Sequence, residues 1–274
     1  MQDVKWAPTG DIGNHREEDY GIDFYMDENH ANNVEETVFE TSHGTRCAGI
    51  IAANDNAKGI IGIAAMAKVK LMSLRILDIE TGEITGEVDS LIEAITFAEN
   101  NGASVCNISA STKLYSAALE SVIKNSKMLF VVSAGNGNGR GVNIDKSPVY
   151  PAAFNFDNVI TVANLNYDGQ LNKTSNFGVR TVDLAAPGTC IYTTNVNNTY
   201  SYSTGTSMAA PMVTGVSALI FSLSEDIPSE KVKEIIVDSV TATEALDQVV
   251  RSSGMLNGAN AIESALKYKT ELYN

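Results

Sequence analysis

The feature that most constrains the fold is an alternation of short apolar runs with stretches of helical periodicity. The apolar runs span residues 68–77, 103–109, 128–136 and 158–164. Each run is nearly continuous in its hydrophobicity, which is typical of strands that are covered on both faces in a parallel sheet. Strands that alternate with helices form right-handed crossovers. The sequence therefore predicts an α/β fold with a central, mostly parallel sheet flanked by helices.

Helices are expected between these runs, where apolar residues recur at helical spacing. The predicted helices cover residues 43–54, 87–102 and 114–125. A longer apolar helix is predicted after Ser207. Pro211 lies close to its start, where the missing N–H of proline is tolerated.

The N-terminal region, residues 1–41, is polar and encodes a first strand poorly, with residues 4–7 as its one candidate. No polar linker divides the chain, so we expect one domain over residues 1–274. The N-terminus lacks the basic region and apolar core of a secretory signal, so no signal peptide is expected and the compartment stays open. No apolar run is expected to reach the roughly 18 residues that span a bilayer.

Charge and cysteine content narrow the choice of partners and redox chemistry. The net charge of −14 argues against nucleic acid or an anionic membrane as the main partner. Three cysteines are too few for a disulfide framework, and an odd number cannot all form pairs. Their small and apolar neighbours predict buried thiols at Cys47, Cys106 and Cys190.

Three short motifs carry residues suited to nucleophilic catalysis. Ser207 lies in "GTSMAAP" at the start of the long apolar helix, where backbone N–H groups and the helix dipole favour developing negative charge. His43, in "HGTRCAG", begins another predicted helix and could take the proton of a serine hydroxyl. Asn136 follows a buried strand in "VVSAGNGNG", at the strand end where parallel sheets bind ligands. Each motif alone is more often structural, so the combination carries the prediction.

In this order, "HGTRCAGIIAAN", "SAGNGNG" and "GTSMAAPMVTG" resemble the histidine, oxyanion-asparagine and serine motifs of the subtilisin-like serine proteases. "VCNISAS", "VDLAAPG" and "GMLNGANAIESAL" resemble later parts of the same family, so the resemblance covers about residues 42–265. It implies a three-layer subtilisin-like fold and a serine endopeptidase that forms an acyl-enzyme and needs no cofactor for its chemistry. By this resemblance Ser207 is the nucleophile, His43 the general acid–base and Asn136 the oxyanion donor, and the substrate is a polypeptide.

The acid that should orient the histidine has three alternatives. A Pro-Thr-Gly sequence matches the family's Asp-Thr-Gly motif with His15 at the expected distance, but it puts Pro8 where the aspartate belongs. An Asp-Ile-Gly sequence supplies Asp11 at a spacing from His43 typical of compact members, but His15 then comes too early. The true aspartate could also lie upstream of Met1. If the acid is lost, the chain is a catalytically impaired pseudoprotease that acts as a peptide-binding or regulatory module.

The resemblance also implies where an extended substrate would bind. It would add to the edge of one strand through backbone hydrogen bonds, with its side chains in alternate pockets. Small, uncharged residues would wall the main pocket and accept mid-sized apolar side chains: Ser109, Ala110, Ser111, Ser133, Ala134 and Gly135. The acidic segment 26–36 could hold a structural calcium ion through oxygen ligands, although no ligand set can be assigned. The oligomeric state is not predicted.

Overall fold

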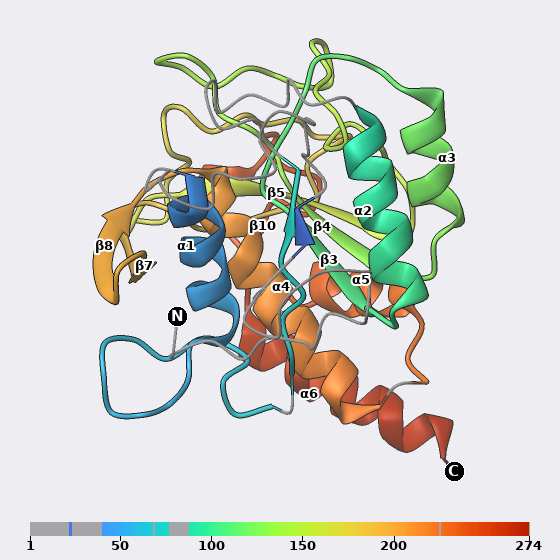
Figure 1. The fold of residues 1–274 in the computed structure, drawn as a ribbon. Helices are drawn as coiled ribbons and strands as arrows, with labels where there is room; N and C mark the ends of the chain where they lie inside the picture. The colour runs from blue at the N-terminus through green and yellow to red at the C-terminus, as the bar shows by residue number, and fades with distance from the viewer. Residues whose placement is uncertain (1–21, 24–39, 68, 77–87, 225, 274) are drawn as a thin grey trace.

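Strands and helices alternate from residue 22 to residue 133, and strands alone then follow one another as far as residue 203 (Figure 1). The computed structural model describes residues 22–23, 40–67, 69–76, 88–224 and 226–273. In chain order the elements are β1 (Ile22–Asp23), α1 (Glu40–Ala52), β2 (Leu74–Arg75), α2 (Val88–Asn100), β3 (Val105–Ile108), α3 (Ala117–Asn125), β4 (Leu129–Ser133), β5 (Val159–Leu165), β6 (Leu184–Pro187), β7 (Ile191–Asn195), β8 (Thr199–Ser203), α4 (Thr206–Leu223), α5 (Ser229–Asp238), β9 (Thr241–Ala242), a 3-10 turn (Glu244–Leu246), β10 (Gly254–Met255) and α6 (Gly258–Leu272).

A six-stranded sheet in the order β3-β4-β5-β6-β10-β9 lies at the centre of the molecule. Its neighbouring strands are parallel, except that β9 runs antiparallel to β10 at one edge. Every residue of β4 and β5 is buried, as near-continuous apolar runs predict. The predicted α/β fold with a mostly parallel sheet is therefore confirmed.

Two separate cores cover the two faces of this sheet. Phe130 and Val132 of β4 pack with residues of α2 and α3, whereas Leu129 and Val131 pack with residues of α4, α5 and α6. Successive strand residues point to opposite faces, so one strand serves both cores. In Figure 1, α2 and α3 lie on one side of the strands, with α4 and α6 on the other. The result is the predicted arrangement of three layers.

Helix α4 is the central helix of the second core. It has 18 residues with a mean hydropathy of 1.5, so by length and composition it could cross a membrane. The expectation that no apolar run reaches this length is therefore wrong. Since 67% of this window is buried inside the molecule, packing against the sheet accounts for its hydrophobicity.

Pro211 is the sixth residue of α4 and lies beyond its first turn. Helix α4 continues through Pro211, so the proline is tolerated, but not because it lies in the first turn: an N–H at position 211 would bond to the carbonyl of Ser207, four residues earlier. Proline leaves that carbonyl without its helical partner. The carbonyl must therefore be satisfied by groups from outside α4.

Two further regions differ from the sequence prediction. The antiparallel hairpin of β7 and β8 was not predicted, and Cys190 precedes it with a φ of 54°. The thiol of Cys190 is exposed, so its predicted burial is wrong, whereas Cys47 is buried and Cys106 half-buried. In the weakly encoded N-terminal region, β1 pairs in parallel with β2, and the candidate strand at residues 4–7 lies outside the described residues.

Candidate active site

The predicted substrate pocket lies where β3 and β4 end side by side. Ile108 of β3 pairs with Val132 of β4, so Ser109 and Ser133 follow in the same register. Gly135 has a φ of 84°, and a Cβ atom there would lie 3.3 Å from the hydroxyl of Ser111. The two segments predicted as pocket walls therefore face each other, and glycine is needed where they come closest.

Ser207, the second residue of α4, lies directly against this edge. Its hydroxyl donates a hydrogen bond to the backbone carbonyl of Ser109, at 3.1 Å. The N–H of the preceding residue, Thr206, donates to Oδ1 of Asn136, at 3.1 Å. The candidate nucleophile, the groove segment and the candidate oxyanion donor are thus joined through two hydrogen bonds.

Asn136 keeps one group available for a ligand. Its side chain is exposed, and its Oδ1 already accepts from Thr206, so Nδ2 is the atom that can donate elsewhere. A Cβ atom on Gly205 would lie 3.4 Å from this Nδ2. Gly205 is also the N-cap of α4 and supplies no side-chain cap. The start of α4 therefore presents backbone N–H groups beside an amide donor to which no described residue offers an acceptor, which suits developing negative charge.

His43 is the fourth residue of α1 and is half-buried. Cys47, four residues later on the same helical face, donates from its thiol to the carbonyl of Ser207, at 3.3 Å. This contact brings the face of α1 that carries His43 to the start of α4. Both His43 and Ser207 are described, and no hydrogen bond joins them, because the Ser207 hydroxyl bonds to Ser109.

The surroundings of His43 favour its neutral form. Burial lowers the pKa of His43 below its usual value of 6.5, and the positive charge of Arg46 lowers this pKa further. A neutral imidazole can accept a proton. The electrostatics of the described residues therefore suit a general base at neutral pH.

The predicted acid and the predicted calcium segment lie in the part of the chain that the structure does not describe. Asp11, Pro8 and His15 lie outside the described residues, as does the acidic segment 26–36. Among the residues that the structure does describe, no group of three or more His, Cys, Asp or Glu side chains could hold a metal ion. The orientation of His43 by a carboxylate and the binding of calcium both stay predictions.

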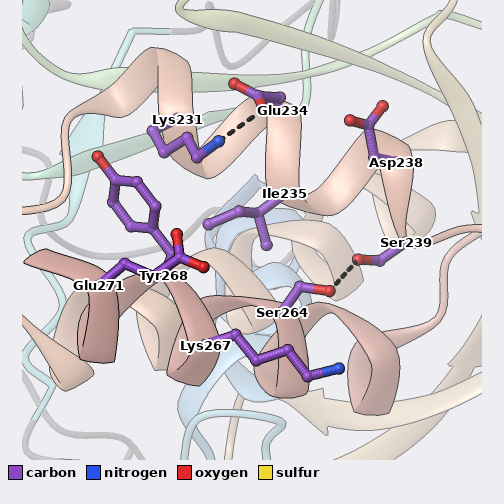
Figure 2. Close-up of a pocket in the computed structure, with 9 residues that line it drawn as sticks. All are labelled: Lys231, Glu234, Ile235, Asp238, Ser239, Ser264, Lys267, Tyr268 and Glu271. Carbon is purple, nitrogen blue, oxygen red and sulfur yellow. Dashed lines mark hydrogen bonds and ion pairs between the residues drawn. The ribbon is translucent and has the colours of Figure 1, made fainter.

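A pocket of about 260 Å³ lies elsewhere, between α5 and α6 (Figure 2). Its lining includes none of the predicted site residues. Charges of both signs surround it, and Lys231 is paired with Glu234 at 2.5 Å and lies over the ring of Tyr268. Since Lys231 and Lys267 of this lining both already pair with glutamates, the pocket gives no reason to move the candidate site away from Ser207.

Two contacts at the site were not predicted from the sequence. The sequence predicted Cys47 only as a buried thiol and Pro211 only as a proline tolerated near the start of its helix. The spacing of four between Ser207 and Pro211 was the available signal, because it removes the donor of the Ser207 carbonyl. The thiol that partly replaces this donor comes from a residue 160 positions away and could not be paired with it by spacing.

The comparisons with known proteins agree with the resemblance. The sequence profile of the subtilase family of peptidases matches residues 11–255. The chain therefore belongs to the subtilase family, whose members are serine-type proteases.

Relatives and solved structures are similar over most of this chain. Subtilisin-like protease 2 of Plasmodium falciparum is 35% identical over 208 residues, which make up 74% of this chain and 15% of that much longer protein. Subtilisin DY of Bacillus licheniformis is 32% identical over 218 residues, covering 78% of this chain and 75% of the relative. A structure titled "Structural basis of subtilase cytotoxin SubAB assembly" superposes with a TM-score of 0.73 at 26% identity, covering 86% of this chain and 79% of that one. The prenylagaramide maturation protease PagA has a TM-score of 0.70 at 27% identity, over 82% of each chain.

Proposed function

We propose that this chain is a serine endopeptidase that cleaves polypeptides through an acyl-enzyme on Ser207. The observation that carries the proposal is the position of Ser207 at the uncapped start of α4, hydrogen-bonded to the groove segment at Ser109. Family membership supports the same reaction class. A polypeptide is the substrate class that fits an exposed strand edge with small, uncharged walls.

In the proposed first step, the Ser207 hydroxyl turns from the Ser109 carbonyl to His43, which takes its proton. Catalytic hydrogen bonds often form only once substrate is bound. The Ser207 Oγ then forms a bond to the carbonyl carbon of the substrate, and the negative charge goes to the carbonyl oxygen. Nδ2 of Asn136 and the N–H of Ser207 would stabilise this oxyanion.

The intermediate collapses when the C–N bond breaks and His43 returns its proton to the leaving amine. Water then attacks the ester, His43 takes the proton of the water, and Ser207 leaves with that proton as the acid product is released. The lowered pKa of His43 supports its role, since the imidazole starts neutral. No metal or cofactor is needed to balance these steps.

Asp11 is the proposed partner of His43. The family match begins at residue 11, so it includes Asp11 and leaves Pro8 outside. A carboxylate there would hold the imidazole in the tautomer that accepts the serine proton. If Pro8 marks a lost aspartate, the alternative function is a pseudoprotease that binds peptides without cleaving them.

A structural calcium ion at segment 26–36 is a further proposal, motivated by its acidic residues. Calcium bound only to the folded chain should raise the melting temperature with increasing concentration. A titration by differential scanning calorimetry, with magnesium as the control ion, tests this. Equal shifts with both ions would show general charge screening and would reject the proposal.

The main experiment uses a fluorophosphonate probe that labels activated serines. Wild-type protein should be labelled at Ser207, as identified by mass spectrometry of the tryptic peptide, and should cleave casein. A folded protein with neither labelling nor cleavage, but with saturable binding of a peptide, would support the pseudoprotease alternative. Labelling at another serine would move the nucleophile and overturn the assignment.

A further inference from the structure

The carbonyl of Ser207 lacks its helical hydrogen bond because the residue that should donate to it is a proline. In an α-helix this carbonyl accepts from the N–H four residues later, and that residue is Pro211, which has none. The proline ring also crowds the carbonyl four residues before it. The carbonyl of this peptide unit therefore lacks its helical donor, whereas its N–H, that of Met208, donates to the carbonyl of Gly205 at 3.0 Å.

Two side chains from other elements donate to this carbonyl instead. The hydroxyl of Ser109, just after β3, donates to it at 3.0 Å, and the thiol of Cys47 in α1 donates at 3.3 Å. Burial raises the pKa of Cys47 to about 11, so the sulfur keeps the proton that it donates. Sulfur is a weak donor, so the hydroxyl of Ser109 supplies the stronger of the two hydrogen bonds.

The hydroxyl of Ser109 is itself held in one orientation. It accepts a hydrogen bond from Nδ2 of Asn107, at 2.9 Å, and Oδ1 of Asn107 accepts from the hydroxyl of Thr214, at 2.9 Å. The Ser109 hydroxyl thus accepts from Asn107 and donates its own proton to the carbonyl of Ser207. The chain of hydrogen bonds starts in the third turn of α4 and returns to its second residue through β3.

We propose that Ser109 and Cys47 are positioning residues that replace the helical donor lost at Pro211 and thereby set the direction of the Ser207 peptide unit. The inference rests on the proposed function, in which Ser207 is the nucleophile. It adds to the predicted role of Ser109 in the substrate groove, which uses the backbone of that residue. A misplacement of about 1 Å at a reacting group can cost on the order of 10²-fold in rate. The Ser109 hydroxyl is therefore expected to affect kcat more than KM.

The first test compares two serines whose hydroxyls both donate to carbonyls of α4. Ser109→Ala removes the donor of a carbonyl that has no helical partner. Ser217→Ala is the matched control, since its buried hydroxyl donates at 2.9 Å to the Val213 carbonyl, which also has a helical N–H donor. We expect Ser109→Ala to lower kcat by about 10- to 100-fold with little change in KM, and Ser217→Ala to stay near wild type.

A rescue experiment separates positioning from general stability. Pro211→Ala restores a backbone N–H that can donate to the Ser207 carbonyl. Added to Ser109→Ala, it should recover most of the lost kcat, and Ser109→Thr, which keeps a hydroxyl, should lose less than Ser109→Ala. A loss of kcat that neither change recovers would overturn the positioning role.

The last measurement follows the NMR chemical shift of the Ser207 carbonyl and does not depend on turnover. Ser207-Met208 is the one Ser-Met pair in the sequence, so carbonyl-¹³C serine with ¹⁵N methionine gives a single cross-peak in a carbonyl–nitrogen correlation spectrum. The Ser207 carbonyl shift should move in Ser109→Ala and return toward wild type when Pro211→Ala is added. It should stay in place in Ser217→Ala.

The two readouts distinguish the possible failures. An unmoved carbonyl signal in Ser109→Ala overturns the proposed hydrogen bond, whatever the activity. A moved signal with unchanged kcat overturns the positioning role alone. If wild-type protein has the expected carbonyl behaviour but neither labels with fluorophosphonate nor turns over, the endopeptidase function fails, and a catalytic role for these contacts fails with it.

Discussion

The central sheet has one edge where its parallel strands begin and another where they end, and the polar groups at these two edges differ in charge. At the start of β6, Asp183 is buried, with 2% of its surface exposed, and pairs with Lys233 at 3.2 Å and Arg251 at 3.0 Å. At the ends of β3 and β4, the polar groups near Ser207 are neutral hydroxyls and amides. The charges at the first edge are fully paired, whereas the second edge keeps a half-buried hydroxyl and an exposed amide.

If Ser207 has its proposed role, one sheet separates stability from chemistry. Asp183 also accepts the N–H of Thr161 at 2.8 Å, so its carboxylate fastens β5, β6 and α5 together. Buried charges with this many partners are costly to disturb. The strand ends face the N-terminus of α4, where backbone donors remain for a ligand. Substitutions at the two edges should therefore affect different measurements.

The largest effect is expected at the strand ends, from Ser207→Ala. Without the nucleophile, peptide hydrolysis should fall by about 10⁶-fold, the scale known for removal of the triad serine in subtilisin, a member of this family. Folding should be unaffected, since alanine suits the first turn of a helix. Hydrolysis of a chromogenic peptide and thermal melting are measured on the same samples. Activity that survives this change would place the nucleophile elsewhere.

The next effect concerns the acid that should orient His43. If Asp11 has this role, Asp11→Asn should cut kcat by about 10⁴-fold and leave the fold intact, because the wrong imidazole tautomer is favoured. If Pro8 occupies the position of a lost aspartate, Asp11→Asn should change little and Pro8→Asp should raise the rate.

Both variants are assayed against the same chromogenic peptide, with Asp157→Asn, at an exposed position before β5, as a control for lost charge. Opposite outcomes for Asp11→Asn and Pro8→Asp decide between the two positions. Unchanged rates in both variants would reject both and favour an aspartate upstream of Met1.

At the other edge, Asp183→Asn should destabilise the protein by about 3–5 kcal/mol, because it leaves two cations without their buried partner. Urea unfolding measures this free energy. The control is Glu234→Gln, which breaks a surface pair with Lys231 and should cost at most about 1 kcal/mol. The folded fraction of Asp183→Asn should keep its kcat. A fall in kcat without a change in stability would contradict the separation between the two edges.

The smallest effect is a shift in pH dependence from Arg46→Gln. In the proposed mechanism neutral His43 is the active form, so activity should rise as pH increases through the pKa of His43. Burial and the charge of Arg46 both lower that pKa. Removing the charge should raise it and move the acid limb of kcat/KM to higher pH. The control Lys267→Gln, which removes a positive charge from α6, should leave the limb in place, and an equal shift in both variants would indicate a general charge effect.

Much of this architecture could be predicted from local sequence patterns. The runs at 103–109, 128–136 and 158–164 appear as β3, β4 and β5, because a strand buried on both faces needs apolar residues throughout. The β7–β8 hairpin was missed because polar and tyrosine residues dominate it, and its apolar alternation is weak. The exposure of Cys190, at the start of this hairpin, was missed with it.

The sequence by itself determined the α/β order, the family and the type of residue available for chemistry, since these depend on composition, periodicity and motifs within short segments. It also determined that the Ser207 carbonyl lacks a helical donor, because proline at position 211 has no N–H. Only the tertiary structure decided which groups fill that gap. Ser109 and Cys47 lie 98 and 160 residues from Ser207, and their meeting depends on how β3 and α1 pack against α4. Residues this far apart in the sequence have no characteristic spacing, so the hydrogen bonds between them could not be predicted from the sequence.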